Sequence, residues 1–256
     1  MRKIAVLIFI VISSRMYAQE KGVFVDSRDG IEYKWVKIGQ QVWMAENLAY
    51  LPAVYSPFEE RVQPQNGREL DVKILESSFQ FVYGYDGTDI TEAKSHYNYE
   101  KNGVLYNYTS ATKSCPDGWH LPSDKEWMEL EEFIGMEKSE IEVMKFVRGD
   151  IADKLRSREF WGDQVKAMDD FGFSILPGGT LYISPNHNNG AKFLRIGQAA
   201  YYWSSTEYNH AIIGNIQGVM RSIECYKSLE FDVANNSIGR YPTSKWYGLS
   251  VRCIKN

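Results

Sequence analysis

The side chains that most often bind metals or transfer protons are sparse in this chain of 256 residues. A zinc site draws its histidine and cysteine ligands from short, recurring spacings. The four histidines are instead scattered: His96, His120, His187 and His210. We therefore expect no metal site of this kind. We interpret His120, which follows Trp119, as a hydrogen-bonded structural residue.

One short segment has the spacing of a catalytic serine. Ser110 and Lys113 match the Ser-x-x-Lys pattern of penicillin-recognising enzymes, but no Ser-Asp-Asn or Lys-Thr-Gly follows them. A four-residue pattern of this kind often arises by chance. The chain also has no Gly-x-Ser-x-Gly, phosphate loop or Gly-x-Gly-x-x-Gly. The sequence therefore predicts no enzyme and no cofactor.

The first eighteen residues have the composition of an export signal. A basic start precedes an unbroken apolar run, Ile4–Ile12, and Ala18 before Gln19 resembles a signal-peptidase site. Nine apolar residues span about 14 Å as a helix, too little for a hydrocarbon core of about 30 Å. We expect residues 1–18 to be a cleaved signal peptide, with no stable membrane insertion afterwards.

Charge and composition limit what the remaining domain, residues 19–256, can bind. Removal of three basic residues with the signal, and of no acid, changes the net charge from -4 to -7. This acidity argues against nucleic acid as a partner and against a polybasic membrane patch. We expect an exported protein, in the periplasm, on the cell surface or outside the cell. Aromatic residues make up 14% of the chain, which fits either a β-rich core or a stacking surface for sugars or peptides.

Hydrophobic spacing predicts an α+β domain. Alternating residues indicate an N-terminal β-hairpin over 23–42, and two helices are expected at 124–134 and 139–146. Residues 51–102 are rich in turn signals and predict a loop-rich segment. From Phe171 onward the pattern indicates short, irregular strands. Because strands and helices do not alternate, we do not expect a doubly wound parallel sheet.

The segment Leu-Pro-Ser-Asp-Lys-Glu-Trp, residues 121–127, has the features of a helix start. Ser123 or Asp124 can cap the helix, and Glu126 occupies the acidic position of a capping box. Trp127 and Leu130 then begin an apolar face. This is the strongest helix prediction in the chain.

Several motifs occur in an order that resembles the Fibrobacter succinogenes major paralogous domain, a family of exported bacterial domains. The motifs lie at Tyr33–Leu48, Gly103–Tyr108, Cys115–Trp127, Gly172–Gly179, Tyr202–Thr206 and Ser250–Cys253. The resemblance implies a C-type-lectin-like fold close to that of formylglycine-generating enzymes. It implies no established activity.

The resemblance also suggests how the three cysteines are used. C-type-lectin-like domains commonly tie an early element to the final strand, which implies a Cys115–Cys253 disulfide. Closing a loop of about 138 residues would contribute roughly 4 to 5 kcal/mol in the chain-entropy model. Cys225 is then left as a small buried side chain, an intermolecular partner or a reactive thiol. Formylglycine chemistry needs two close cysteines, so we regard that oxidoreductase activity as the least favoured alternative.

A lectin-type calcium site is not indicated. The Gln63-Pro64-Gln65-Asn66 segment is a poor match to the lectin motif, and the residues after Trp203 lack its acids. Oxygen-rich stretches occur at residues 86–89 and at Asp232, Asn235 and Asn236, and we interpret them as turns and solvated loops. A structural cation is left open.

The resemblance places the exposed binding surface in the C-terminal half, within Glu207–Leu249. Aromatic rings and amides there suit a glycan or a protein ligand, because rings supply stacking area and amides supply directed hydrogen bonds. The candidate binding residues are Tyr208, Asn209, His210, Tyr241, Trp246 and Tyr247. We expect Trp119, Trp127 and Trp203 to be buried instead. A purely structural role in a surface or secretion assembly is the main alternative to ligand binding.

Overall fold

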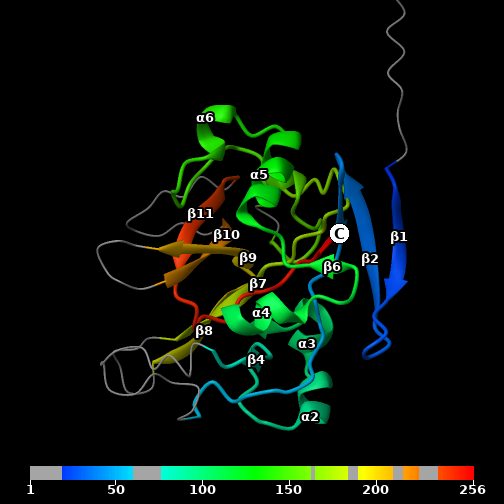
Figure 1. Ribbon diagram of the computed structural model, residues 1–256, viewed down its shortest axis with the longest axis vertical. Coiled ribbons are helices and arrows are strands. Elements are labelled where there is room, and N and C mark those ends of the chain that lie inside the picture. Colours follow the sequence, from blue (N-terminus) through cyan, green and yellow to red (C-terminus); the bar gives the residue numbers. More distant parts are fainter. Residues whose placement is uncertain (1–18, 60–75, 163–164, 184–189, 210–215, 225–235) are drawn as a thin grey trace, which may run out of the picture.

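A computed structural model describes residues 19–59, 76–162, 165–183, 190–209, 216–224 and 236–256. The predicted signal peptide lies outside these residues, and so do His210 and Cys225. The described chain is a mixed α+β structure built mostly from sheets, as predicted (Figure 1).

The first sheet joins the two ends of the described chain. The sheet contains the predicted hairpin and a third strand that follows it in sequence. The strand near the C-terminus lies between this third strand and a short strand from the middle of the chain. Figure 1 shows this sheet along one side of the molecule, with β1 outermost. Its strands, in spatial order, are β1 (Lys21–Val25), β2 (Glu32–Ile38), β3 (Gln41–Met44), β12 (Ile254–Lys255) and β6 (Trp119–His120).

The second sheet is longer and more regular than the sequence predicted. In spatial order its strands are β11 (Ile238–Thr243), β10 (Ile216–Glu224), β9 (Ala199–Asn209), β7 (Gly178–Ile183) and β8 (Ala191–Ile196). All neighbours are antiparallel except β7 and β9. The expectation of short strands was wrong because β9 alone runs for 11 residues. A third pairing joins β4 (Gln80–Phe81) to β5 (Leu105–Tyr106).

The strongest helix prediction is confirmed. Helix α5 spans Asp124–Phe133, and Ser123 and Glu126 form the full capping box. The second predicted helix, 139–146, is shorter: α6 covers only Lys138–Ile141. The backbone leaves the helix because the carbonyl of Lys145 accepts a hydrogen bond from Arg240 N in β11. Within the predicted loop-rich and central segments lie further helices: α2 (Ile90–Lys94), α3 (Tyr97–Asn102), α4 (Tyr108–Ser114) and a 3-10 turn (Ala152–Lys154).

Motif tryptophans fill the core, as expected. Trp203 and Trp127 are almost fully buried and Trp119 is 9% exposed. Trp127 packs against Trp43 with ring centroids 4.8 Å apart, and Phe173 packs edge-on against both rings. The motifs therefore serve chiefly to build the interior.

A buried charge network ties α5 to the second sheet. Asp124 accepts hydrogen bonds from Arg221 Nη1 at 2.7 Å and Arg240 Nη2 at 2.6 Å. Glu131, on the same side of α5, accepts from Arg221 and from Arg148 Nη2 at 2.9 Å. Burial acts to raise the pKa of Asp124, but hydrogen bonds and charge from Arg240 and Arg221 outweigh it and lower the pKa. The helix is thus held by ion pairs as well as by its apolar face.

The implied disulfide is present. Cys115, which follows α4, is bonded to Cys253, with Cα atoms 5.9 Å apart. Met44 N also donates to the carbonyl of Cys253 at 2.9 Å, so the cross-link lies beside β3. It joins the centre of the chain to its C-terminal segment.

Candidate functional site

The candidate aromatic residues do not meet on one surface. Trp246 is only 2% exposed, so the expectation that it is an exposed contact was wrong. It lies in an apolar cluster with residues of β4, β5, β7 and β8, including Phe81, Leu105 and Leu181. Tyr247 is half-buried against the same cluster and packs on Tyr182 at 4.9 Å. Neither residue offers an open ring face of the kind expected.

Tyr208 and Tyr241 lie on strands that flank β10 on its two sides. Tyr208 pairs with Gln217 and Tyr241 pairs with Met220, both in β10. A register shift between Gly218 and Met220 separates these two positions along β10. Tyr241 packs on Phe146, with ring centroids 4.1 Å apart. Asn209 ends β9, and His210 lies outside the described residues.

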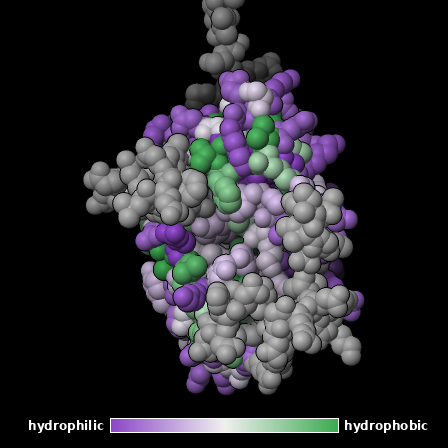
Figure 2. Space-filling model, turned by 90° about the vertical axis from the view of Figure 1, so that its left-hand side faces the viewer, coloured by the Kyte–Doolittle hydropathy of each residue, from purple (hydrophilic) through white to green (hydrophobic). Residues whose placement is uncertain are grey.

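Figure 2 views the side on which β11 and β8 lie. Among the residues not drawn in grey, hydrophobic side chains form small separated groups rather than one continuous patch. The aromatic surface predicted for the C-terminal half is therefore not a single face in the described part of the chain.

Three neighbouring hollows lie along the N-terminal sheet and share lining residues. Their volumes are about 290, 640 and 830 Å³, which is the usual size range of ligand pockets. The middle hollow shares Gln19 and Asp170 with the largest one. It shares Ile38, Gly39, Gln40 and Phe133 with the smallest one. We call these neighbouring hollows the trough.

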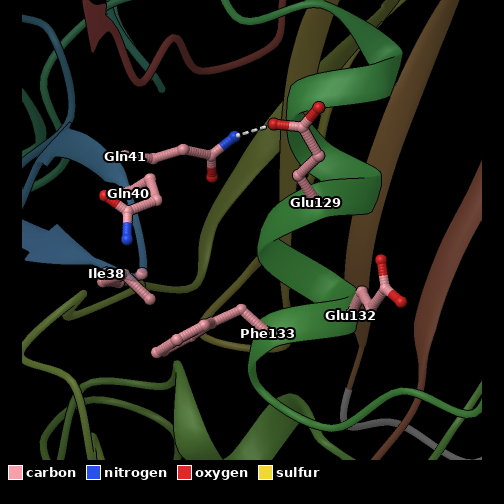
Figure 3. A pocket seen from close by; sticks show the side chains of 7 residues that line it. Ile38, Gln40, Gln41, Glu129, Glu132 and Phe133 are labelled. Atoms are coloured by element: carbon pink, nitrogen blue, oxygen red, sulfur yellow. Dashed lines mark hydrogen bonds between the residues drawn. The ribbon is translucent and has the colours of Figure 1, made fainter.

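An exposed phenylalanine stands at one end of the trough (Figure 3). Phe133, the last residue of α5, is 56% exposed and points toward the β2–β3 turn. Gly39 in that turn has φ +62°, and a Cβ there would lie 2.9 Å from Phe133 Cδ2. Glycine is therefore needed both for the backbone conformation and for the position of the ring. Phe171 packs edge-on against Phe133 at 6.0 Å.

Amides and carboxylates surround this ring. Gln41 is held firmly: its Nε2 donates to Glu126 O at 3.0 Å and to Glu129 Oε2 at 3.1 Å, and its Oε1 accepts from Trp43 Nε1. Gln40 is exposed and, among the described residues, forms no side-chain hydrogen bond. Glu132 makes only a long, exposed contact with Lys138 at 3.7 Å. Polar groups are thus available beside the open ring.

The other end of the trough lies over one face of β1 and β2. Pairing places Lys21 with Val36 and Val23 with Lys34 on this face, whereas Gly22 and Trp35 share the opposite face. The loop at Asp169 covers this end, and Ser174 holds it by donating N and Oγ to the Asp169 carboxylate at 2.8 and 2.6 Å. The trough wall is therefore fixed by local hydrogen bonds.

The trough has an acidic balance. Its lining includes six carboxylates and three lysines, so a polyanionic ligand would meet net repulsion. An aromatic ring beside amide and carboxylate groups suits a neutral or cationic ligand with hydroxyl or amine donors. The carboxylates are Glu20, Glu46, Glu129, Glu132, Asp169 and Asp170, and the lysines are Lys21, Lys34 and Lys37.

Our reading of the sequence missed this site, although one signal was available. On α5 the buried face carries Trp127, Leu130 and Ile134, while Phe133 falls beside Glu129 and Glu132 on the polar face. A large apolar residue on the polar face of a helix is a candidate contact residue. The loop at Asp169 lines the trough only through long-range packing, which no local sequence pattern indicates.

Several of the residues considered for chemistry make local hydrogen bonds in the structure. The described residues contain no group of three or more His, Cys, Asp or Glu side chains arranged to hold a metal. His120 lies between Glu126 at 2.8 Å and Asn256 at 2.6 Å. Asp89 caps α2. Ser110 is buried beside Gln80, and Lys113 is exposed.

The described helices are all too short or too polar to cross a membrane. In comparisons with known proteins, the family model described as Fibrobacter succinogenes major domain matches residues 36–255. No curated protein and no solved structure matches the chain.

Proposed function

Because this chain belongs to the Fibrobacter succinogenes major domain family, we propose that it is an exported binding module whose trough holds a glycan or a peptide. The family match covers β3, α5 and the last three residues of β2, which supply part of the trough wall. The C-type-lectin-like fold is part of the same proposal. It is supported by the disulfide that ties Cys115 to the C-terminal segment.

The exposed Phe133 ring is the observation that carries this proposal. A phenylalanine that is 56% exposed leaves apolar area in water, and a ligand that covers it gains free energy at about 25 cal/mol per Å². Phe171 supports the ring from one side, so the ring is positioned before a ligand arrives. A positioned ring loses little entropy on binding.

The polar lining indicates the chemistry of the ligand. Gln40 and Glu132 flank the ring and can accept hydrogen bonds from hydroxyl or amine groups. The excess of carboxylates disfavours sulfated or uronic-acid polymers. We therefore propose a neutral or amine-bearing ligand, in extended form because the middle hollow shares lining residues with each of the other two.

A paired screen tests this function. The purified protein would be applied to an array that carries neutral, amine-bearing and anionic glycans, and to a library of extended peptides. Binding to neutral or amine-bearing probes that a Phe133→Ala substitution weakens is the expected outcome. Binding confined to anionic probes, or binding that Phe133→Ala leaves unchanged, would contradict the trough assignment.

Export is a separate part of the proposal with its own test. The basic and apolar composition of residues 1–18 supports it. Fractionation of producing cells, followed by N-terminal sequencing, should recover the protein outside the cytoplasm beginning at Gln19. Recovery of the intact N-terminus from the cytoplasm would overturn it.

Two other functions differ in their measurable consequences. A structural component of a surface assembly would bind protein but no small ligand, and the open edge of β1 favours this second candidate. An oxidoreductase of the formylglycine-generating type would show thiol-dependent turnover. Cys115 and Cys253 are bonded to each other here, and the proposal assigns them a structural role.

A further inference from the structure

The outer edge of β1 presents backbone groups to solvent in a regular row. Lys37 N donates to Glu20 O, and Asp26 N donates to Ile31 O, each at 2.8 Å. In an antiparallel pair, inward-facing residues recur at every second position. Between these two bonds, the backbone groups of successive β1 residues therefore point alternately toward β2 and away from it. The N–H and C=O groups of Lys21, Val23 and Val25 are the ones that point away from the sheet. Within the described residues no other strand pairs with this edge.

The side chains of this edge are also open. Val23 is 55% exposed and Val25 is 59% exposed. β-Branched residues favour strands, and a row of free backbone groups beside them is a template for another strand. The edge thus has both the backbone and the side chains needed for strand addition.

The other edges of the two five-stranded sheets carry features that disfavour strand addition. β11 contains Pro242, and Lys145 already pairs with its Arg240. β8 contains Arg195 with φ +67°, which interrupts a regular edge. β6 has only two residues. Proline, backbone irregularity and short length are the usual protections of an edge, and β1 has only the charge of Lys21.

We propose that β1 pairs antiparallel with β1 of a second copy of this chain, about a two-fold axis at Val23. In this register Val23 faces Val23 of the second copy, and Lys21 faces Val25. The residues whose backbone groups point outward lie symmetrically on either side of Val23, so the outward-pointing backbone groups of the two copies come to lie opposite one another. The inference goes beyond the proposed ligand-binding function and does not depend on it.

Charge complementarity favours a second copy over an unrelated strand. In the proposed dimer Lys21 of the second copy lies opposite Val25, and Val25 pairs with Glu32 within its own chain. Lys21 of the second copy would therefore lie two strands away from Glu32, on the same face of the joined sheet. Strands are about 4.8 Å apart, and lysine and glutamate side chains together span the resulting distance of about 10 Å. Within one chain Lys21 pairs with Val36, four residues along β2 from Glu32. The Lys21–Glu32 contact is therefore specific to the pair of copies.

The interface is small, and this sets the expected behaviour. One five-residue strand from each copy buries far less than the roughly 1,600 Å² of a standard stable interface. The dimer should accordingly be weak and depend on concentration. Sedimentation velocity over a dilution series of the purified protein should show a reversible monomer–dimer equilibrium.

Substitutions at the edge test the register. Val23→Lys places like charges directly opposite each other and should raise the dimer Kd by about tenfold or more. Leu194→Lys is the matched control, because Leu194 is 37% exposed on another edge strand, and it should leave the Kd unchanged. Lys21→Glu and Glu32→Lys should each weaken the dimer. The double variant, which restores opposite charges, should recover it.

Three results would overturn the proposal. The first is a protein that stays monomeric at every concentration. The second is a dimer that persists in folded Val23→Lys. The third is a pair of single charge reversals that the double variant does not rescue. Circular dichroism and the Tm establish that each variant is folded, and the charge-swap pair provides a test that does not depend on Val23.

Discussion

Arg252 and Asn47 are joined by a buried hydrogen bond, and the contacts around it link four of the sequence motifs. Arg252 Nη2 donates to Asn47 Oδ1 at 2.9 Å, and Tyr202 Oη donates to the same oxygen at 3.0 Å. Arg252 is fully buried, its guanidinium lies 4.7 Å from the ring centre of Phe173, and it also donates to the carbonyls of Phe173 and Ser174. Burial lowers the pKa of Arg252. The motif residues therefore hold one another in place rather than a ligand.

Arg252→Lys should destabilise the protein. Lysine has no planar fork, so several of the Asn47, Phe173 and Ser174 acceptors lose their donor, at a cost of about 1 to 3 kcal/mol for each buried group left unpaired. Denaturant unfolding should show a loss of about 2 kcal/mol or more. Arg158→Lys, at an exposed position, should change the unfolding free energy by less than about 0.5 kcal/mol. Equal effects of the two changes would contradict this role.

The Cys115–Cys253 disulfide should be found in protein purified under non-reducing conditions. Mass spectrometry of non-reduced digests should recover the linked peptides. Replacing both cysteines with alanine should lower the unfolding free energy by up to roughly 4 to 5 kcal/mol, because the bond closes a long loop in the unfolded chain. Detection of Cys225 bridged to either residue would contradict the pairing.

The ion network predicts a specific acid sensitivity. The pKa of Asp124 is lowered in the folded state, so its contribution to stability is present above the unfolded pKa of about 3.9 and is lost as pH falls through the folded pKa. Asp124→Asn should cost about 3 to 5 kcal/mol at pH 7, because Arg221 and Arg240 lose a charged partner. It should also flatten the decline of unfolding free energy at low pH. Parallel pH profiles for the two proteins would contradict this.

Trp246→Ala should behave as a core substitution. Trp246 is 2% exposed, so its removal should cost about 3 to 5 kcal/mol. Phe133→Ala removes a largely exposed ring and should cost less than about 1 kcal/mol. Urea unfolding of both variants tests the contrast, and the reverse order would place Trp246 on the surface.

Sequence patterns correctly predicted the elements whose formation depends on residues close together in the sequence. The capping box at Ser123 and Glu126 specified the start of α5, and turn residues specified the first hairpin. Long-range contacts determined what was missed. The exit from α6 depends on β11 pairing with Lys145, and the burial of Trp246 depends on β5, β7 and β8. The trough likewise combines residues 19, 39, 133 and 170, whose proximity no local pattern encodes.

Ligand binding by the trough through Phe133, as proposed above, is tested most directly by an affinity comparison. Isothermal titration with the tightest glycan or peptide from the screen would compare Phe133→Ala with Phe146→Ala. Phe146 is 64% exposed but lies outside the trough, packed on Tyr241. Phe133→Ala should weaken binding about tenfold, or about 1.4 kcal/mol, with little change in Tm, while Phe146→Ala should leave the Kd unchanged. An unchanged Kd for Phe133→Ala, or an equal loss in Phe146→Ala, would contradict it.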